Sequence, residues 1–525
     1  MNGGSGGAAG TGGATTTETG GPWRSELFPE VWTPKFETAQ GYFLHDFSYA
    51  GFKYGEEPSA GNLPVLKAAD YGVDPTGAVD STPALQAALD DAAAGGGGIV
   101  ELAAGLFRFD GALLVSASNV VLRGQGADET RLHFTKTAGM SDTAHLLFDA
   151  KLTTGVEALL VEDGLPRSTE VRVADAAGFS VGDDVAVGFV ISPELVEEHG
   201  MTGTWEAFNG TWQTFFRRTI VSIDTSSTPH VLVLDVPLRY PAKVRDAASV
   251  RRETGYLTGV GVEKLSVANA ASWDEAWAVT RNHAIEFGHV ADGFIVDVAS
   301  FPSPGAPPSG KGAGAHLLSG GILVRESKRV TVARTHLSSP QNRGPGGNGY
   351  LFEIQRSSEV LIRASTGTAG RHNFIQNWGF GTTGCVMSEV ESRDGKAFVD
   401  KGSTTGFTSL SEYHHSLATA NLVEASLFDD GFSTVNRNGE STGAGHTGTE
   451  DVFWNVRGKG MLRSMQFGVG YVIGTAGVSV VTESPLPMSV GTEPVDFVEG
   501  LDRGADLEPA SLYDAQRALR LGLAP

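Results

Sequence analysis

The sequence of 525 residues contains a single cysteine, Cys385. One thiol excludes an intrachain disulfide framework, so stability must come from core packing. No apolar run approaches the roughly 18–20 residues of a membrane span, so no transmembrane segment is expected. Positive charge is scarce too, with 39 lysines and arginines against 61 acidic residues and a net charge of −22. This balance disfavours a nucleic-acid partner, because phosphate neutralisation needs basic side chains, although a local basic patch could still bind an acidic polysaccharide.

Glycine, by contrast, is abundant, and many of the 70 glycines end short apolar runs. This pattern favours strands and turns over long helices. Residues 2–21 consist mainly of Gly, Thr and Ala and predict a tether with nothing to pack. Such a segment is typical of an exported or lipid-anchored protein, although no signal peptide is visible; the alternative is an artificial linker or a misplaced start. We therefore expect an extracellular or cell-surface protein.

Composition and pattern divide the chain into six segments. They are a flexible tether (1–22), an N-terminal arm rich in aromatic residues (23–60), a first set of coils with a capping helix (61–158), a small inserted β-barrel or sandwich (159–243), the main coils (244–500) and a C-terminal capping helix (501–525). Hairpin signals indicate that the insert is antiparallel. Its aromatic residues at 205–216 suit either a sugar-stacking platform or burial at the junction with the coils.

Short apolar runs recur from residue 259 onward. Steps of 25–37 residues separate one position in each run, taken as Leu265, Ile295, Thr331, Leu361, Val386, Val423 and Phe453. A period of this size, with short strands split by Gly, Ser and Asn turns, is typical of a β-solenoid. No coil can bury its own inward side chains, so stacking of the coils makes the core. The longer steps predict loops that build a groove between Tyr350 and Lys459.

The chain between Ala69 and Gly126 carries further short motifs. They are Asp70-Tyr71-Gly72-Val73, Asp80-Ser81-Thr82, Gly97-Gly98-Ile99-Val100 and Asn119-Val120-Val121-Leu122-Arg123-Gly124. This segment resembles the N-terminal part of pectate-lyase-superfamily proteins, and the resemblance implies a single-stranded right-handed parallel β-helix. Proteins that share this segment include lyases, glycoside hydrolases, epimerases and phage tailspikes. The resemblance therefore implies the fold and leaves the activity open.

Two adjacent acids, Asp429 and Asp430, are the candidates for hydrolysis. Glycoside hydrolysis uses two carboxyl groups whose pKa values differ, and two like charges side by side raise one pKa. Both can face a groove only where the chain bends, because neighbouring strand residues point to opposite faces. The order of this pair and of Gly445-His446 is similar to the Asp-Asp and Gly-His-Gly motifs of polygalacturonases. Thr447 replaces the last glycine, and an Arg-Ile-Lys equivalent is missing.

Basic residues between 371 and 446 are the candidates for a lyase reaction. That reaction needs a base and a cation that faces the uronate carboxylate. The catalytic candidates for this route are His372, Lys401, Arg437 and His446. The polar stretch 371–384 suits hydrogen bonding to a sugar, and the alternative is an asparagine ladder inside the coils. The candidates for substrate binding are Arg371, Asn373, Gln376, Trp378, His414, His415 and Glu440.

The metal ligands cannot be assigned from the sequence. Calcium could bind among Asp394, Asp400, Glu412, Asp429 and Asp430, but their spacing fits no compact calcium loop. Zinc is not expected at His414-His415, because neighbouring strand residues diverge and Cys385 is a lone thiol. Four other histidines are expected to be exposed to solvent or to have their ring nitrogens hydrogen-bonded within the core, and these are His283, His289, His316 and His336.

The sequence as a whole predicts an all-β protein, a right-handed parallel β-helix with an inserted antiparallel β-domain and short capping helices. The expected function is an exported enzyme that cleaves an acidic polysaccharide as a lyase. One alternative is an inverting hydrolase of polygalacturonase type, and another is a non-catalytic adhesin or tailspike-like protein. A monomer is expected, whereas a tailspike would more often be a trimer.

Overall fold

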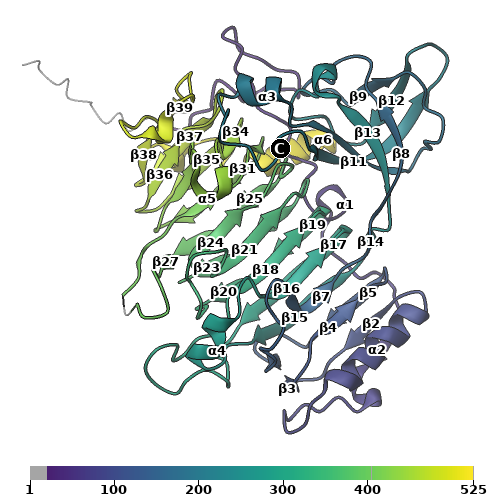
Figure 1. Ribbon diagram of the computed structural model, residues 1–525, viewed down its shortest axis with the longest axis vertical. Helices are drawn as coiled ribbons and strands as arrows, with labels where there is room; N and C mark the ends of the chain where they lie inside the picture. The colour runs from purple at the N-terminus through teal and green to yellow at the C-terminus, as the bar shows by residue number, and fades with distance from the viewer. Residues whose placement is uncertain (1–20, 404, 524–525) are drawn as a thin grey trace, which may run out of the picture.

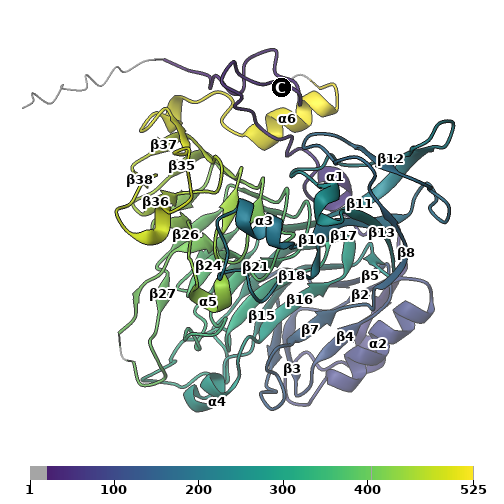
Figure 2. The same cartoon turned by 45° about the horizontal axis from the view of Figure 1, so that its top comes forward.

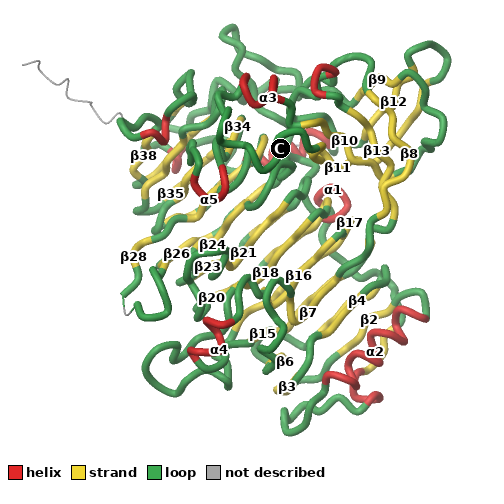
Figure 3. The backbone as a smooth tube through the Cα atoms, viewed as in Figure 1, coloured by secondary structure: helices red, strands yellow, loops and turns green. Residues whose placement is uncertain are grey.

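The computed structural model describes residues 21–403 and 405–523. Parallel strands stack coil upon coil along the molecule, and helices lie only at its periphery (Figures 1 and 3). The predicted fold class, a right-handed parallel β-helix with an inserted antiparallel β-domain, is confirmed. The expected tether of residues 1–22 lies almost entirely outside the described residues. Among those described, no helix is both long enough and apolar enough to cross a membrane.

The largest sheet contains 19 strands and forms two faces of the β-helix. Its strands are β1 (Val65–Lys67), β2 (Gly98–Glu101), β3 (Gly105–Phe109), β5 (Val120–Arg123), β6 (Thr130–Phe134), β14 (Leu257–Thr258), β15 (Gly261–Ala268), β17 (Val290–Ser300), β19 (Lys328–Ala333), β20 (His336–Ser338), β22 (Leu361–Arg363), β23 (Thr366–Thr368), β25 (Val386–Ser388), β26 (Glu391–Arg393), β31 (Leu422–Glu424), β32 (Leu427–Phe428), β35 (Val452–Arg457), β37 (Tyr471–Ala476) and β39 (Phe497–Glu499). β15 pairs with both β5 and β6, so this long strand continues from one face into the next.

A second parallel sheet of ten strands forms the remaining face. Its strands are β4 (Leu113–Val115), β7 (Ala144–Phe148), β16 (His283–Gly288), β18 (Gly320–Arg325), β21 (Tyr350–Gln355), β24 (His372–Gln376), β29 (Ser411–Tyr413), β33 (Phe432–Thr434), β36 (Met461–Ser464) and β38 (Ser479–Val481). Two short pairs complete the coils, β27 (Lys396–Ala397) with β28 (Phe407–Thr408) and β30 (Ala418–Thr419) with β34 (Gly448–Thr449).

The core consists of side chains that stack in register from coil to coil. Leu146, Ile285, Ile322, Phe352 and Phe374 occupy equivalent positions on successive strands of the ten-stranded sheet. The rings of Phe352 and Phe374 lie 4.8 Å apart and are nearly parallel. This stacking is the physical basis of the 25–37-residue repeat, because each coil buries the inward face of its neighbour.

Helix α2 (Thr82–Ala94) packs its apolar stripe over the first coils, whereas the N-terminal arm and the C-terminal helix, expected to cap an end, lie against the outer side of the 19-stranded sheet over several coils. The N-terminal arm and helix α6 (Leu512–Arg520) lie side by side (Figure 2) and are joined by a hydrogen bond from the Tyr513 hydroxyl to the Ala50 carbonyl. The arm includes the one-turn helix α1 (Phe52–Gly55). Together they cover an apolar cluster that includes Trp454.

The insert is a six-stranded antiparallel sheet between the coils. Its strands are β8 (Thr153–Leu159), β9 (Glu170–Val173), β10 (Asp184–Val190), β11 (Trp212–Asp224), β12 (His230–Leu234) and β13 (Ser249–Thr254). An antiparallel bridge between Leu160 and Val173 joins the two edges into a barrel. The sheet extends beyond the expected 159–243 at both ends, because β8 and β13 pair with each other. Helix α3 (Pro193–Glu198) lies between β10 and β11.

The barrel contacts the coils through buried aromatic rings and buried ion pairs. Trp205 and Phe215 pack against Phe380 of the coils, so the aromatic stretch fills the junction rather than forming an exposed platform. Arg239 donates two hydrogen bonds to the Glu359 carboxylate, at 3.1 and 2.9 Å, and both side chains are fully buried. These contacts hold the barrel beside the ten-stranded sheet.

Candidate active site

The outward face of the ten-stranded sheet carries two adjoining cavities. The larger, about 520 Å³, lies over β16, β18 and β21 and is lined by residues that include His283, Tyr350 and Glu353. The smaller, about 290 Å³, lies over β24 and β29. Arg371 and His414 line both cavities, so the two form one continuous depression, hereafter the groove. The lining of the groove includes Asp142 and Arg281, which precede in the sequence the expected first residue of the groove, Tyr350.

A row of acidic residues crosses the floor of the groove. Parallel pairing aligns Glu286 with Leu323, Leu323 with Glu353, Glu353 with Ile375, and Ile375 with Glu412. Adjacent strands lie about 4.8 Å apart, so each glutamate stands roughly 10 Å from the next. Residues that are far apart in sequence thus form one line because of the register.

Glu353 is held by three hydrogen-bond donors. They are His283 Nε2 (2.9 Å), Asn377 Nδ2 (2.9 Å) and Gln355 Nε2 (2.6 Å). Burial alone would raise the pKa of Glu353, but these donors, His283 foremost, lower the pKa below its ordinary value. Because the ionised carboxylate only accepts hydrogen bonds, Nε2 of His283 carries a proton, which leaves Nδ1 as the ring nitrogen that could act as a base. The pair therefore has the arrangement of an oriented general base.

A glycine makes room for this histidine. A Cβ atom on Gly320 would lie 2.4 Å from Cδ2 of the His283 ring. Gly320 pairs directly with His283, and two residues later Ile322 pairs with Phe352 of β21. On the other side of Gly320, on strand β21, lies Tyr350, which also lines the larger cavity. Burial raises the pKa of Tyr350 well above its ordinary value, so the phenol stays protonated.

The smaller cavity contains a second cluster, made of His372, Glu412 and His414. Nδ1 of His414 contacts Oε1 of Glu412, and Nε2 of His372 lies 3.4 Å from the same oxygen. Burial would raise the pKa of Glu412, but the two histidines hold the pKa well below its usual range. Burial lowers the pKa of His372 to about 4, so its ring is neutral at pH 7. One oxygen and two nitrogens within 4.8 Å of one another could also hold a metal ion.

Arg371 separates the two clusters. Its Nη1 donates a hydrogen bond to the Gly344 carbonyl at 2.7 Å, and its guanidinium lies 5.9 Å from the Tyr350 ring. Among the described residues, no carboxylate lies within ion-pair distance of this guanidinium. A cation that faces a groove without an internal counter-charge suits an anionic ligand.

Trp378 forms an exposed wall of the larger cavity. Its side chain is 41% exposed, and its ring stacks on that of His415 at 4.4 Å. Phe208 from the inserted barrel lies behind both rings. The insert therefore supports an aromatic surface of the kind that packs against sugar rings.

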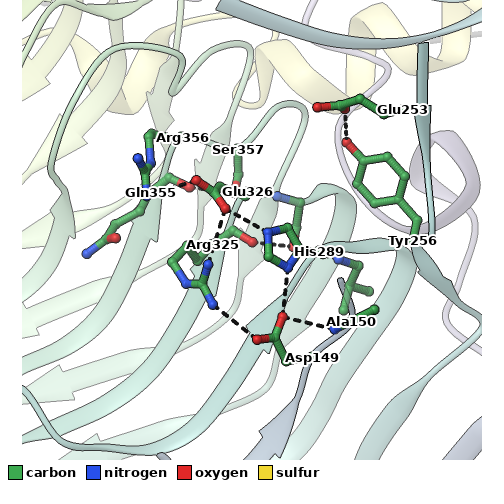
Figure 4. Close-up of polar contacts among 12 residues, drawn as sticks. Asp149, Ala150, Glu253, Tyr256, His289, Arg325, Glu326, Gln355, Arg356 and Ser357 are labelled. Atoms are coloured by element: carbon green, nitrogen blue, oxygen red, sulfur yellow. Dashed lines mark hydrogen bonds and ion pairs between the residues drawn. The ribbon is translucent and has the colours of Figure 1, made fainter. Parts of the chain in front are cut away.

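An ionic network supports the other end of the groove floor (Figure 4). His289 bridges Asp149 and Glu326, each at 2.7 Å, and Arg325 contacts both acids and Glu286. Burial would lower the pKa of His289, but the two carboxylates raise the pKa to about 9. The network fixes Arg325, whose side chain lines the larger cavity beside Gln355.

Comparison with known proteins agrees with this architecture. Residues 65–167 match a family described as rhamnogalacturonase A/epimerase, pectate lyase-like. This segment is therefore similar to a pectate-lyase-like family, and the chain as a whole folds as a right-handed parallel β-helix. No curated protein matches its sequence. The match covers the first coils and the start of the insert, where the sequence motifs indicated the same superfamily.

Several solved structures are similar to this chain at low sequence identity. A tailspike of Acinetobacter baumannii bacteriophage AP22, in complex with a capsular saccharide, is 12% identical over 83% of this chain and 69% of its own, with a TM-score of 0.46. The tailspike of Pseudomonas phage LKA1 is 12% identical over 83% and 77%, with a TM-score of 0.44. An exopolygalacturonase of Thermotoga maritima is 10% identical over 85% and 81%, with a TM-score of 0.32.

Several predicted site residues of the β-helix protein do lie in the groove. They are Arg371, His372, Trp378, His414, Arg437 and Glu440. Arg437 donates hydrogen bonds to the His414 carbonyl and to the Ser441 hydroxyl, and Glu440 lies beside it. His415 lies behind Trp378, with Nε2 2.7 Å from the Ser441 carbonyl.

The predicted acid pair does not face the groove. Asp429 pairs with Arg393, whereas Asp430 is buried and accepts hydrogen bonds from Asn373 Nδ2 and the Gly395 amide, both at 2.9 Å. Burial, rather than its like-charged neighbour, raises the pKa of Asp430 to about 6. Asn373 therefore belongs to a buried polar network within the coils.

Three other candidates also lie away from the groove. Lys401 lies on an exposed loop and pairs with Asp274 of helix α4 (Trp273–Ala278). His446 is buried under the insert, with Nε2 3.1 Å from the His199 carbonyl. Gln376 points into the core, because it pairs with Ile354 and Tyr413 in the inward row.

Sequence reasoning missed His283, Tyr350 and Glu353. In the sequence His283 is one of several scattered histidines, and its carboxylate partner lies 70 residues further along the chain. The available signal was the register: three glutamates occur at the same position of strands that the repeat brings into line.

Proposed function

We propose that this protein binds an acidic polysaccharide in the groove and cleaves it by β-elimination. The observation that carries the proposal is the larger cavity, whose lining includes Arg371, without a carboxylate partner among the described residues, and a histidine held by an ionised glutamate. A lyase needs these two features together, a cation for the uronate carboxylate and a base for the neighbouring carbon. The exposed ring of Trp378 supplies a surface for the sugar.

In the proposed reaction, Arg371 pairs with the uronate carboxylate and stabilises the negative charge that develops on it. Nδ1 of His283 removes the proton from the adjacent carbon, and Glu353 stabilises the resulting imidazolium. The electron pair of that C–H bond forms a carbon–carbon double bond as the glycosidic C–O bond breaks. Tyr350 donates its phenolic proton to the leaving oxygen, and the proton on His283 then returns through solvent to the Tyr350 phenolate, which restores both groups for the next turnover.

A glycan polymer is the natural ligand for a groove that is open along several coils. Such polymers are found outside the cytoplasm, which agrees with the expectation of an exported or surface-bound protein. The inward-facing core residues and the barrel contribute by holding the floor of the groove rigid.

Hydrolysis is the second candidate, and the acidic row favours it. Glu353 and Glu412 stand roughly 10 Å apart, near the separation of about 6.5–9.5 Å that inverting glycosidases use. One of the two would have to act as the general acid. The pKa of each is lowered, so neither carboxyl is suited to hold a proton at neutral pH. For this reason elimination is the better-supported reaction.

A panel of uronate-containing and neutral polysaccharides tests the proposal with two readouts, the ultraviolet absorbance of unsaturated uronate and the release of reducing ends. Both signals should rise with an acidic glycan. His283→Ala and Glu353→Gln should each reduce turnover by roughly 10²–10⁴-fold without lowering the melting temperature. Glu389→Gln, at a surface ion pair with Arg363, is the matched control.

The outcomes separate the alternatives. Reducing ends without absorbance would establish hydrolysis in place of elimination. Binding without either signal would support a glycan-binding adhesin or tailspike-like protein, and sedimentation analysis would then show whether it is a trimer. Full turnover in both His283→Ala and Glu353→Gln would refute the proposed base.

A further inference from the structure

The cluster of His372, Glu412 and His414 has an unusual donor arrangement. Glu412 and His414 lie two residues apart on one side of a strand, because the intervening Tyr413 points into the core. His372 comes from the neighbouring strand β24 and completes the group. The three ligand atoms lie within 4.8 Å of one another, and all three side chains line the smaller cavity.

The hydrogen bond of His372 determines its tautomer. Nδ1 lies 2.5 Å from the Leu410 carbonyl oxygen, which can only accept, so Nδ1 carries the proton. Nε2 of the neutral ring is then a lone pair, and it faces Oε1 of Glu412 at 3.4 Å. Nε2 and Oε1 are both acceptors, and Oε1 also contacts Nδ1 of His414; a metal ion in place of the proton on this Nδ1 would interact with all three atoms. Histidine ligands of metals commonly donate their second ring nitrogen to a backbone carbonyl in this way.

Arg437, which also lines the smaller cavity, does not fill this role. The hydrogen bonds of Arg437 go to the His414 carbonyl and to the Ser441 hydroxyl, and its ion pair is with Glu440. Among the described residues, Glu412 makes ion-pair contacts with the two histidines only. The space between the three ligands is therefore not occupied by a guanidinium.

We propose that His372, Glu412 and His414 bind one divalent transition-metal ion, with zinc as the representative ion. Two imidazole nitrogens and one carboxylate oxygen form a donor set that suits zinc and its neighbours, whereas calcium prefers oxygen ligands throughout. Three protein ligands leave a coordination position open, and that position faces the groove. The ion would hold a carboxylate of the glycan one subsite away from His283, a use that rests on the proposed function.

Sequence reasoning rejected zinc at His414-His415 for a sound reason, because the two side chains diverge. His415 stacks on Trp378, while His414 turns to the groove. The second imidazole comes instead from His372, one coil earlier. Only the pairing of β24 with β29 brings it there.

Calorimetric titration of the untagged, chelator-treated full chain with zinc chloride tests the proposal in the absence of glycan. One equivalent should bind, and a calcium excess should not displace it. His372→Ala and His414→Ala should each weaken binding by roughly tenfold or more. His336→Ala, which removes an exposed histidine on β20, should leave the affinity unchanged.

X-ray absorption spectroscopy of the zinc-loaded native chain supplies a readout that needs no variant. Two imidazole ligands and one carboxylate are predicted. The absence of zinc binding, displacement by calcium, fewer than two imidazoles, or unchanged affinity in both histidine variants would overturn the proposal. Cleavage measured with the metal-free chain tests the proposed function separately, so failure of one does not imply failure of the other.

Discussion

At the scale of single residues, burial and hydrogen bonding decide which groups keep their charge. Glu353 stays ionised because three donors surround it, whereas Asp430 is buried with fewer donors and has a raised pKa of about 6. One oxygen of Asp430, Oδ1, has no hydrogen-bond partner among the described residues. The two carboxylates therefore differ in role for a physical reason: one can orient a base, and the other prefers to be neutral inside the coils.

Asp430 should make stability depend on pH. Its pKa is about 6 in the folded chain and near 3.8 when unfolded, so the folded state binds more protons between these values. This contribution to stability is present below pH 4 and is lost as pH rises through 6. Asp430→Asn should therefore gain stability relative to the native chain between pH 4 and 7, by at most about 3 kcal/mol. Urea unfolding at both pH values measures the change.

Asp429→Asn is the matched control for this experiment, because its side chain is partly exposed and paired with Arg393. A stability difference between Asp430→Asn and the native chain that stays constant from pH 4 to 7 would contradict the buried, proton-binding carboxyl.

At the scale of elements, the groove depends on networks that join the ends of neighbouring strands. His289, between β16 and β17, connects Asp149 after β7 with Glu326 after β18. Because Arg325 is part of the same network, the charge of the histidine helps to position a side chain that lines the groove.

The protonated form of His289 should stabilise the fold. The pKa is raised from 6.5 to about 9, so the stabilisation is complete below about pH 6.5 and is lost as pH rises through 9. His289→Gln should lower the melting temperature at pH 7, and the difference from the native chain should shrink by pH 10. His336→Gln is the control, because His336 is exposed on β20. A difference that is equal at pH 7 and pH 10 would contradict this account.

At the scale of the whole molecule, the inserted barrel is held to the coils by buried charges. Glu359 of the coils contacts Arg239 and, at 3.4 Å, Arg218 of the insert, and all three side chains are almost fully buried. A buried cation that loses its partner is costly, since it remains out of water without compensation.

Glu359→Gln should therefore destabilise the protein by roughly 3–5 kcal/mol in urea unfolding. Asp297→Asn removes one of two acidic partners of the exposed Arg334 and should cost at most about 1 kcal/mol. Equal losses in the two variants would show that the interface does not depend on the buried pair.

The architecture could be predicted from the sequence because its determinants are local and repeated. Apolar residues recur at a period close to the length of one coil, as where Ile295 aligns with Val332 and Val332 with Ile362 on successive strands of the largest sheet. The motifs from Asp70 to Gly124 indicated the superfamily in the segment where the family match lies. Neither inference requires knowledge of the exact register.

The candidate site could be predicted only in part, because it depends on that register. The polar stretch after Arg371 pointed to the right coils, and Arg371, Trp378 and His414 line the groove. His283 and Glu353 come together across two strands, and nothing local marks them as partners. Asp429 and Asp430 lie outside the groove, the first paired with Arg393 and the second buried, and the sequence alone could not decide to which side each would point.

The most direct test of the central claim compares a uronate polysaccharide with the same polymer after its carboxylates have been reduced to alcohols. The native chain should generate the unsaturated-uronate absorbance from the acidic polymer and leave the reduced polymer uncut, because Arg371 then has no anion to bind and the adjacent proton is no longer acidic. Equal cleavage of both polymers, measured by reducing ends, would contradict an elimination reaction in this groove.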